Sequence, residues 1–250
     1  MSTSPKKTAA VAVKWSAASG RIVEVHNPLK APAIANLIAS TAPTTWAVDV
    51  PFGWPDQFVA LLANRHQRPL TADLVPDVAG WEKWRTRQVA QRLTDRFLTD
   101  DPRIRTRPLP ASFQLLGATA AAWTLIESQL AAAGVPVDRA GVAGRVCETY
   151  PSAVLAAWGA PKGTGKHTWP ALRNRFPFLT CDPELEHLLV SDDVCDAVVC
   201  AMAARARDLG LTVDPDDDQL DAARREGWIH VSLHAAGRLL DVDGEPPARP

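Results

Sequence analysis

The stretch TTWAVDVPFGWP, from Thr44 to Pro55, joins a short apolar run to a rigid turn. The run predicts a strand that carries Asp49 at its end, and Pro51 stops the strand because proline lacks a backbone N–H group. A carboxylate placed there costs free energy unless something binds it. We therefore expect Asp49 either to hold a ligand or to cap the turn at Phe52 and Gly53 through its side chain.

The segments around this stretch predict an α/β fold. Residues 9–15 and 21–27 read as a strand hairpin, followed by a helix near 32–40. Further along, we expect helices at 57–64, 81–98, 112–134, 151–159 and 192–209, a strand at 145–148 and a last strand near 225–232. This order predicts a mixed sheet flanked by helices.

The domain boundaries follow from the same pattern. We expect one domain over residues 8–235 with a helical insertion over 56–140, and flexible tails at 1–7 and 244–250. The 250 residues are 46% hydrophobic, which is enough for a sizeable core.

Charge and cysteine content bear on the binding partners and the cellular compartment of the protein. The net charge of −1 predicts no bulk attraction to nucleic acid or to acidic membranes. The sequence has no apolar run of membrane length and no secretory leader at its start, so we expect a cytoplasmic protein. Its four cysteines lack C-x-x-C spacing and are expected to be buried thiols in a reducing compartment.

Four carboxylates are the candidate site. Asp49 and Glu148 end predicted strands, and Asp193 and Asp196 share one face near the start of a helix. Ligands of open α/β sheets gather at the carboxyl ends of strands, and clustered carboxylates suit Mg²⁺ or Mn²⁺. The alternative for the helix pair is that acidic residues near its start only favour the helix dipole, which explains Asp192 well and Asp196 poorly.

The motifs around these residues resemble the DUF429 family, from about residue 11 to residue 229. The resemblance rests on AVDVPFGWP, RLTD, CETYPSAVL, DDVCDAVVCAMAA and EGWI in this order. It implies a ribonuclease H-like fold and a nuclease or phosphodiesterase that uses a carboxylate-bound divalent metal. It also implies that Asp49, Glu148, Asp193 and Asp196 are both the catalytic residues and the ligands of Mg²⁺ or Mn²⁺.

The first strand departs from the family pattern. Lys14 stands where members of the family carry an aspartate, so a positive charge replaces a negative one at the expected site. Three interpretations stay open: Lys14 pairs with Asp49 in place of a metal, contacts substrate, or lies in solvent. The first makes the chain a catalytically impaired ribonuclease H-like binding protein.

Basic residues supply candidate phosphate contacts. We expect Arg92, Lys166 and His167 to bind substrate beside the carboxylates, with nucleic acid or a nucleotide as the partner. The GTGK sequence that ends at Lys166 lacks the spacing of a phosphate-binding P-loop. Solvated loop charge remains the alternative for Lys166 and His167, and an ion pair with Asp95 is the alternative for Arg92.

Overall fold

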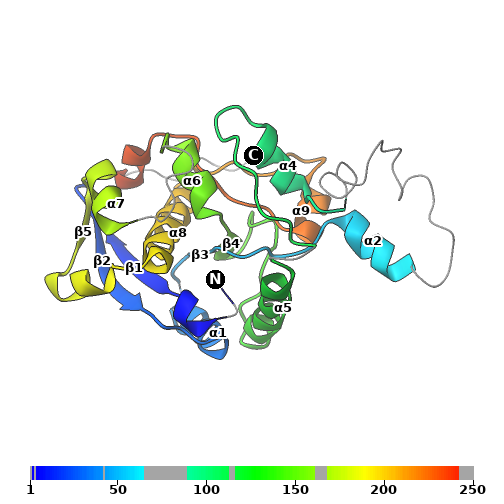
Figure 1. Ribbon diagram of the computed structural model, residues 1–250, viewed down its shortest axis with the longest axis horizontal. Coiled ribbons are helices and arrows are strands. Elements are labelled where there is room, and N and C mark those ends of the chain that lie inside the picture. Colours follow the sequence, from blue (N-terminus) through cyan, green and yellow to red (C-terminus); the bar gives the residue numbers. More distant parts are fainter. Residues whose placement is uncertain are drawn as a thin grey trace.

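The structure is a computed structural model that describes residues 2, 4–41, 43–64, 89–112, 116–160 and 168–241. Two small β-sheets lie side by side and helices cover them (Figure 1). The fold is therefore of the mixed α/β class that the sequence predicts. Among the described residues, no helix combines the length and the apolar character needed to cross a membrane.

Five strands form the two sheets. They are β1 (Ala10–Trp15), β2 (Gly20–His26), β3 (Trp46–Val48), β4 (Val146–Glu148) and β5 (Leu179–Cys181). The first sheet has the order β1-β2-β5, in which β1 and β2 form the predicted antiparallel hairpin and β5 runs parallel to β2. The second sheet is the parallel pair β3-β4. Parallel pairing places the ends of β3 and β4 together, which brings the Asp49 turn beside Glu148.

Helices make up most of the remaining regular structure. They are α1 (Ala31–Ser40), α2 (Asp56–Asn64), α4 (Leu93–Asp100), α5 (Gly117–Ala132), α6 (Pro151–Ala157), α7 (Trp169–Arg175), α8 (Asp192–Asp208) and α9 (Leu220–Glu226), with 3₁₀ turns at Pro5–Lys7, Pro183–Leu188 and Ala236–Leu240. In the segment 56–140, the described elements are the helices α2, α4 and α5. In Figure 1, α2 projects from the body of the molecule.

The expected helix over 81–98 starts too early, because its described part is helical only from Leu93. Residues 81–88 lie outside the described residues, residues 89–92 are not helical, and α4 begins only at Leu93. The reason is local: the backbone N–H of Arg92 donates to the Asp95 carboxylate at 2.9 Å, which caps the helix there. Arg92 is thus held in extended backbone outside the helix.

The C-terminal part also differs from expectation. The predicted strand over 225–232 is replaced by the end of α9 and by single bridges from Ile229 to Glu148 and from Ser232 to Thr212. Gly227 ends α9 with φ +91°, so the chain turns before it reaches the sheet. Strand β5 was not predicted, because its three residues are too short to show an alternating pattern.

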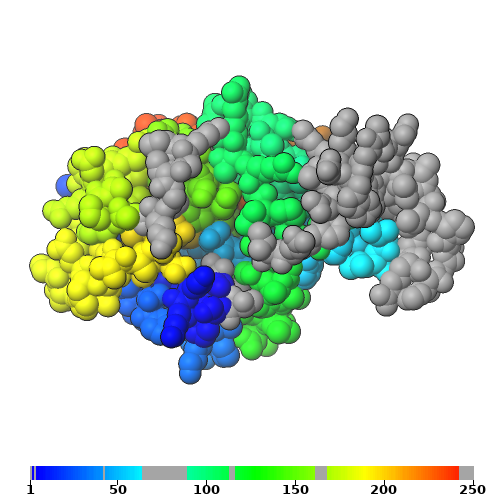
Figure 2. Space-filling view, in the orientation of Figure 1, coloured from blue at the N-terminus to red at the C-terminus, as the bar shows by residue number. Residues whose placement is uncertain are grey.

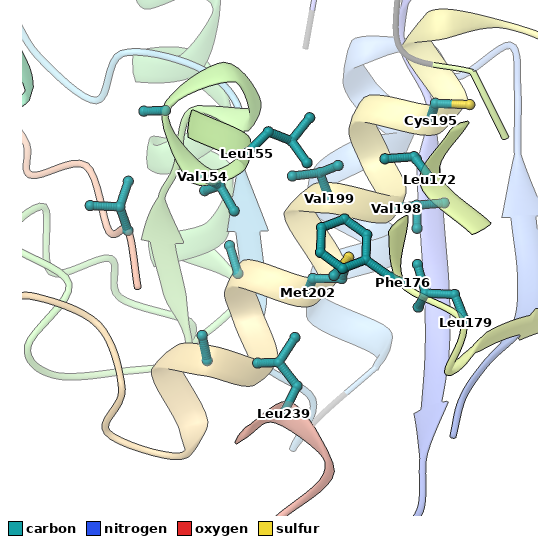
Figure 3. Packing of buried hydrophobic residues seen from close by; sticks show 14 of the residues in the cluster. Val154, Leu155, Leu172, Phe176, Leu179, Cys195, Val198, Val199, Met202 and Leu239 are labelled. Carbon is teal, nitrogen blue, oxygen red and sulfur yellow. The ribbon is translucent and has the colours of Figure 1, made fainter. Parts of the chain in front are cut away.

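Helix α8 joins the two sheets, because it packs against both β1 and β3. Ser191 caps it, accepting a hydrogen bond from the Val194 N–H group at 3.2 Å. One face of α8 is buried in the larger hydrophobic cluster. Figure 3 shows Val198, Val199 and Met202 of α8 among side chains from α6 and α7. The opposite face is not used for this packing and borders a pocket.

Candidate functional site

A pocket of about 600 Å³ lies between the two sheets. Residues from β1, β3 and α1 line it together with one face of α8. The α8 side chains that line it recur at three- and four-residue intervals, as one helix face must; they are Asp193, Asp196, Ala197, Cys200, Ala201, Ala204, Arg205 and Asp208. Asp49, directly after β3, lines the same pocket.

Three of the four predicted carboxylates, Asp49, Asp193 and Asp196, therefore line this pocket, and the Asp196 charge acts on both of the others. The N-terminal turn lies beside them, and its Lys7 also lines the pocket. In Figure 2 the dark-blue N-terminal residues lie at the surface next to yellow residues near the start of α8. The acidic end of the pocket is thus formed by β3, α8 and the start of the chain.

The electrostatics of these carboxylates are those of a cation site. Burial raises the pKa of Asp49, the positive charge of the N-terminus acts to lower it, and the nearby Asp196 carboxylate acts to raise it. Burial also raises the pKa of Asp193, as do its acidic neighbours Asp192 and Asp196, while Lys7 acts in the opposite direction. A positive charge bound among these groups would relieve both burial and repulsion.

The donor set fits a magnesium or manganese ion held by few protein ligands. Mg²⁺ commonly uses one or two carboxylates and keeps several waters. Asp49 and Asp196 supply two carboxylates that line the same pocket, and the pocket has room for water. In the described ranges, no group of three or more His, Cys, Asp and Glu side chains is close enough to hold a metal ion. A cation here would therefore complete its shell with water.

Glu148 lies elsewhere, in a buried ion network. Its two carboxylate oxygens accept hydrogen bonds from Arg92 at 2.7 and 2.9 Å, and one of them also accepts the Phe52 N–H at 2.9 Å. Arg92 and Glu148 are each only 2% exposed. The bonds to Arg92 and Phe52 occupy both Glu148 oxygens, and Glu148 does not line the pocket of the three aspartates.

Arg92 is the centre of that network. It also donates to both oxygens of Asp95, at 3.0 and 3.2 Å, and to the Glu226 carbonyl at 3.1 Å. Burial acts to lower the pKa of Arg92, but the carboxylates of Asp95 and Glu148 outweigh it and raise the pKa. Burial raises the pKa of Glu148, and Arg92 opposes that rise. The ion pair with Asp95, one of the alternatives for Arg92, is present.

Glu226 is a buried residue that motif reasoning did not single out as functional. Its carboxylate accepts the backbone N–H groups of Asp56, at 2.7 Å, and Leu93, at 2.6 Å. It thus joins the starts of α2 and α4. The signal was present in the sequence, since Glu226 begins the EGWI motif, but only the fold shows what the motif contacts.

The remaining candidates are placed as follows. Lys14 is exposed on β1 and does not line the pocket, whereas its neighbours Val13 and Trp15 do. Its cross-strand partner on β2 is Arg21. β1 therefore contributes apolar side chains to the pocket wall. Lys166 and His167 lie outside the described residues.

Comparison with known proteins supplies the family. Residues 5–224 match the family described as a protein of unknown function, DUF429. The chain belongs to the DUF429 family. Curated proteins gave no match, and solved structures gave none either. The DUF429 motifs named above divide between two places: the Asp-x-x-Asp motif of α8 lines the pocket, while the Arg-x-Thr-Asp, Glu-x-Tyr-Pro and Glu-Gly-Trp motifs meet in the buried network.

Proposed function

We propose that this DUF429 protein is a divalent-cation-dependent phosphodiesterase whose site is the acidic end of the pocket. One observation carries the proposal: Asp49 from the end of β3 and Asp196 from α8 line one pocket, close enough that the Asp196 charge raises the pKa of Asp49. A carboxylate in a pocket whose pKa is raised by desolvation and by a neighbouring charge, as for Asp49, is a recurring sign of a functional site. The phosphodiester bond as the target rests on the family resemblance, including its ribonuclease H-like expectation.

The residues divide the work as follows. Asp49 and Asp196 would hold Mg²⁺ or Mn²⁺, and Asp193 would orient a water in its shell. A divalent cation at such a site offsets phosphate charge and lowers the pKa of a water. Lys7, which lines the same end, supplies a positive charge for a phosphate oxygen. Arg92 and Glu148 take no part in the reaction; they fix the turn after Asp49 through the Phe52 N–H.

The experiment is a titration of Mn²⁺ by calorimetry, with cleavage of phosphodiesters assayed on the same samples. Asp49→Asn and Asp196→Asn are each expected to weaken Mn²⁺ binding about tenfold or more and to abolish cleavage. Asp192→Asn is the matched control: it removes the same charge from the same helical turn, at a residue that does not line the pocket. Cleavage that persists in Asp196→Asn would overturn the proposed mechanism.

A second candidate is a binding protein without catalytic activity. It is favoured by one observation, namely that β1 presents Val11 and Val13 to the pocket and no carboxylate. In the same titration, Lys14→Asp is expected to leave Mn²⁺ affinity unchanged, because Lys14 is exposed outside the pocket. Metal binding without cleavage of any phosphodiester would favour this second candidate.

We place the protein in the cytoplasm. The support is that Cys147, Cys181, Cys195 and Cys200 are all free thiols, and that Cys147 and Cys195 are buried. Such thiols suit a reducing compartment.

A further inference from the structure

The pocket continues well beyond its acidic end. From Asp193 to Asp208 the lining face of α8 spans about 22 Å at the helical rise of 1.5 Å per residue. A volume of about 600 Å³ is that of a small-molecule site. The pocket is bounded by two sheets and a helix, whereas duplex-binding proteins use open surfaces of about 1,000 to 2,500 Å².

The charges along the pocket oppose a long nucleic acid. Five acidic side chains line it in the described chain, against the two basic ones Lys7 and Arg205. The Arg205 guanidinium already donates to the carbonyl oxygens of Leu239, at 3.2 Å, and Asp241, at 2.9 Å. Binding a polyanion requires about one cationic contact for each phosphate that is neutralised. The lining can therefore accept one or two phosphates beside a bound cation, but not a chain of them.

The walls beyond the acidic end suit a flat apolar group. Trp46 lines the pocket three residues before Asp49, about 10 Å away along β3. Its indole Nε1 donates to Thr41 Oγ1 at 2.9 Å, which fixes the ring. On the α8 side, this part of the pocket is lined by the small residues Ala197, Ala201 and Ala204. Stacking on an indole is a common way to bind a base.

We infer that the substrate is a nucleotide-sized phosphodiester, bound with its phosphate at Asp49 and Asp196 and its base in the apolar part of the pocket. This inference rests on the proposed function and names its substrate class. It decides between the two partners that the sequence left open, long nucleic acid and nucleotide.

The test compares two substrates in Mn²⁺: the p-nitrophenyl ester of thymidine 5′-monophosphate and a DNA duplex of about 20 base pairs. The wild-type protein is expected to cleave the nucleotide ester, with the duplex cleaved at least about tenfold more slowly. Binding of both is also measured by calorimetry in Ca²⁺, so that the comparison does not depend on turnover. Equal or better binding and cleavage of the duplex would overturn the inference.

A variant pair locates the base. Ala201→Phe fills the apolar part of the pocket and is expected to weaken binding of the nucleotide ester about tenfold while Mn²⁺ affinity stays unchanged. Ala131→Phe on the exposed face of α5 is the control. If Ala201→Phe unfolds the chain, Ala201→Leu takes its place.

The two proposals fail in different ways. If only the substrate inference is wrong, Mn²⁺ binds normally and the Ala201 variant binds the ester as well as the wild type does. If the proposed function itself is wrong, Mn²⁺ does not bind at Asp49 and Asp196.

Discussion

At the residue scale, Asp49 combines two opposed requirements. It sits at the end of a strand because the Pro51 turn ends β3 there, and it is half-buried because β3 lies under α8. Burial raises its pKa, so the folded protein holds a proton on Asp49 at pH values where the unfolded chain has released it. Stability must then fall as pH rises above the ordinary pKa of 3.8.

Asp49→Asn is therefore expected to stabilise the apo protein at pH 7. The variant removes a group that is costly to ionise, and Tm should rise by about 2–4 °C for each 1 kcal/mol recovered. Thermal unfolding followed by circular dichroism from pH 3.5 to 8 measures this, and the gain should vanish at the acid end. Added Mn²⁺ should raise the Tm of the wild type and not that of the variant.

Asp101 provides a control of opposite sign. Its hydrogen bonds from Arg103 lower its pKa, so its ionised form stabilises the fold above the unfolded pKa and that gain is lost in acid. Asp101→Asn should lower Tm at pH 7. A fall in Tm for Asp49→Asn as well at pH 7 would show that the burial of Asp49 is not costly.

At the element scale, the buried network explains why separate helices begin and end where they do. Arg92 leaves α4 to reach Glu148 at the end of β4, and Glu226 caps the starts of α2 and α4. Gly227, which ends α9, lies beside the Glu148 carboxylate. A Cβ atom at Gly227 would lie 2.5 Å from the Glu148 Oε2 atom and 3.0 Å from the Arg92 Nη1 atom.

Gly227→Ala is expected to destabilise more than Gly134→Ala. Both glycines have positive φ, +91° and +77°, which costs an alanine about 1–2 kcal/mol, and Gly227, with ψ +157°, also lies in a region essentially restricted to glycine, so its backbone cost is the higher one. Only Gly227 has atoms in the way, since nothing lies within 4 Å of a Cβ at Gly134. The difference should be about 1.5–3 kcal/mol, the worth of a disturbed hydrogen bond to a charged group. Urea unfolding of the two variants measures it, and equal losses would contradict this account.

The helices and strands also differ in how well the sequence predicted them. Segments with a strong local signal were predicted well: the helix expected over 192–209 is present as α8, and the first two strands pair as a hairpin. The helix expected through Arg92 was wrong because its apolar spacing continues past Arg92, whereas the Asp95 carboxylate caps the helix there and the Arg92 side chain pairs with the distant Glu148. Periodicity along the chain contains no information about such a partner.

At the scale of the whole molecule, α8 is the element that holds the two sheets together. Its buried face packs in the larger cluster, and it contacts both β1 and β3. Met202 on that face has no exposed surface. The other face of α8 carries small and acidic side chains. The sheets therefore contact α8 but leave a space along this face, which is the pocket.

Met202→Ala is expected to cost about 2–5 kcal/mol and to shift unfolding by tryptophan fluorescence and by far-ultraviolet circular dichroism together. The two probes should coincide because loss of α8 releases both sheets at once. Leu125→Ala on α5, at a side chain 69% exposed, is the control and should change stability little. Separate transitions for the two probes would show that the sheets fold independently.

The sequence by itself determined the fold class, the strand hairpin, the capped helix α8, the end of a strand at Asp49 and the common helix face of Asp193 and Asp196, because these depend on spacing and on residues close in the chain. Only the tertiary structure decided which carboxylates meet. Asp49 and Asp196 line one pocket, Glu148 forms an ion pair with Arg92, and Lys14 is exposed away from the pocket. The physical reason is that a buried charge is satisfied by whichever opposite charge or hydrogen-bond donor the packing brings to it, and that partner lies far away in the chain.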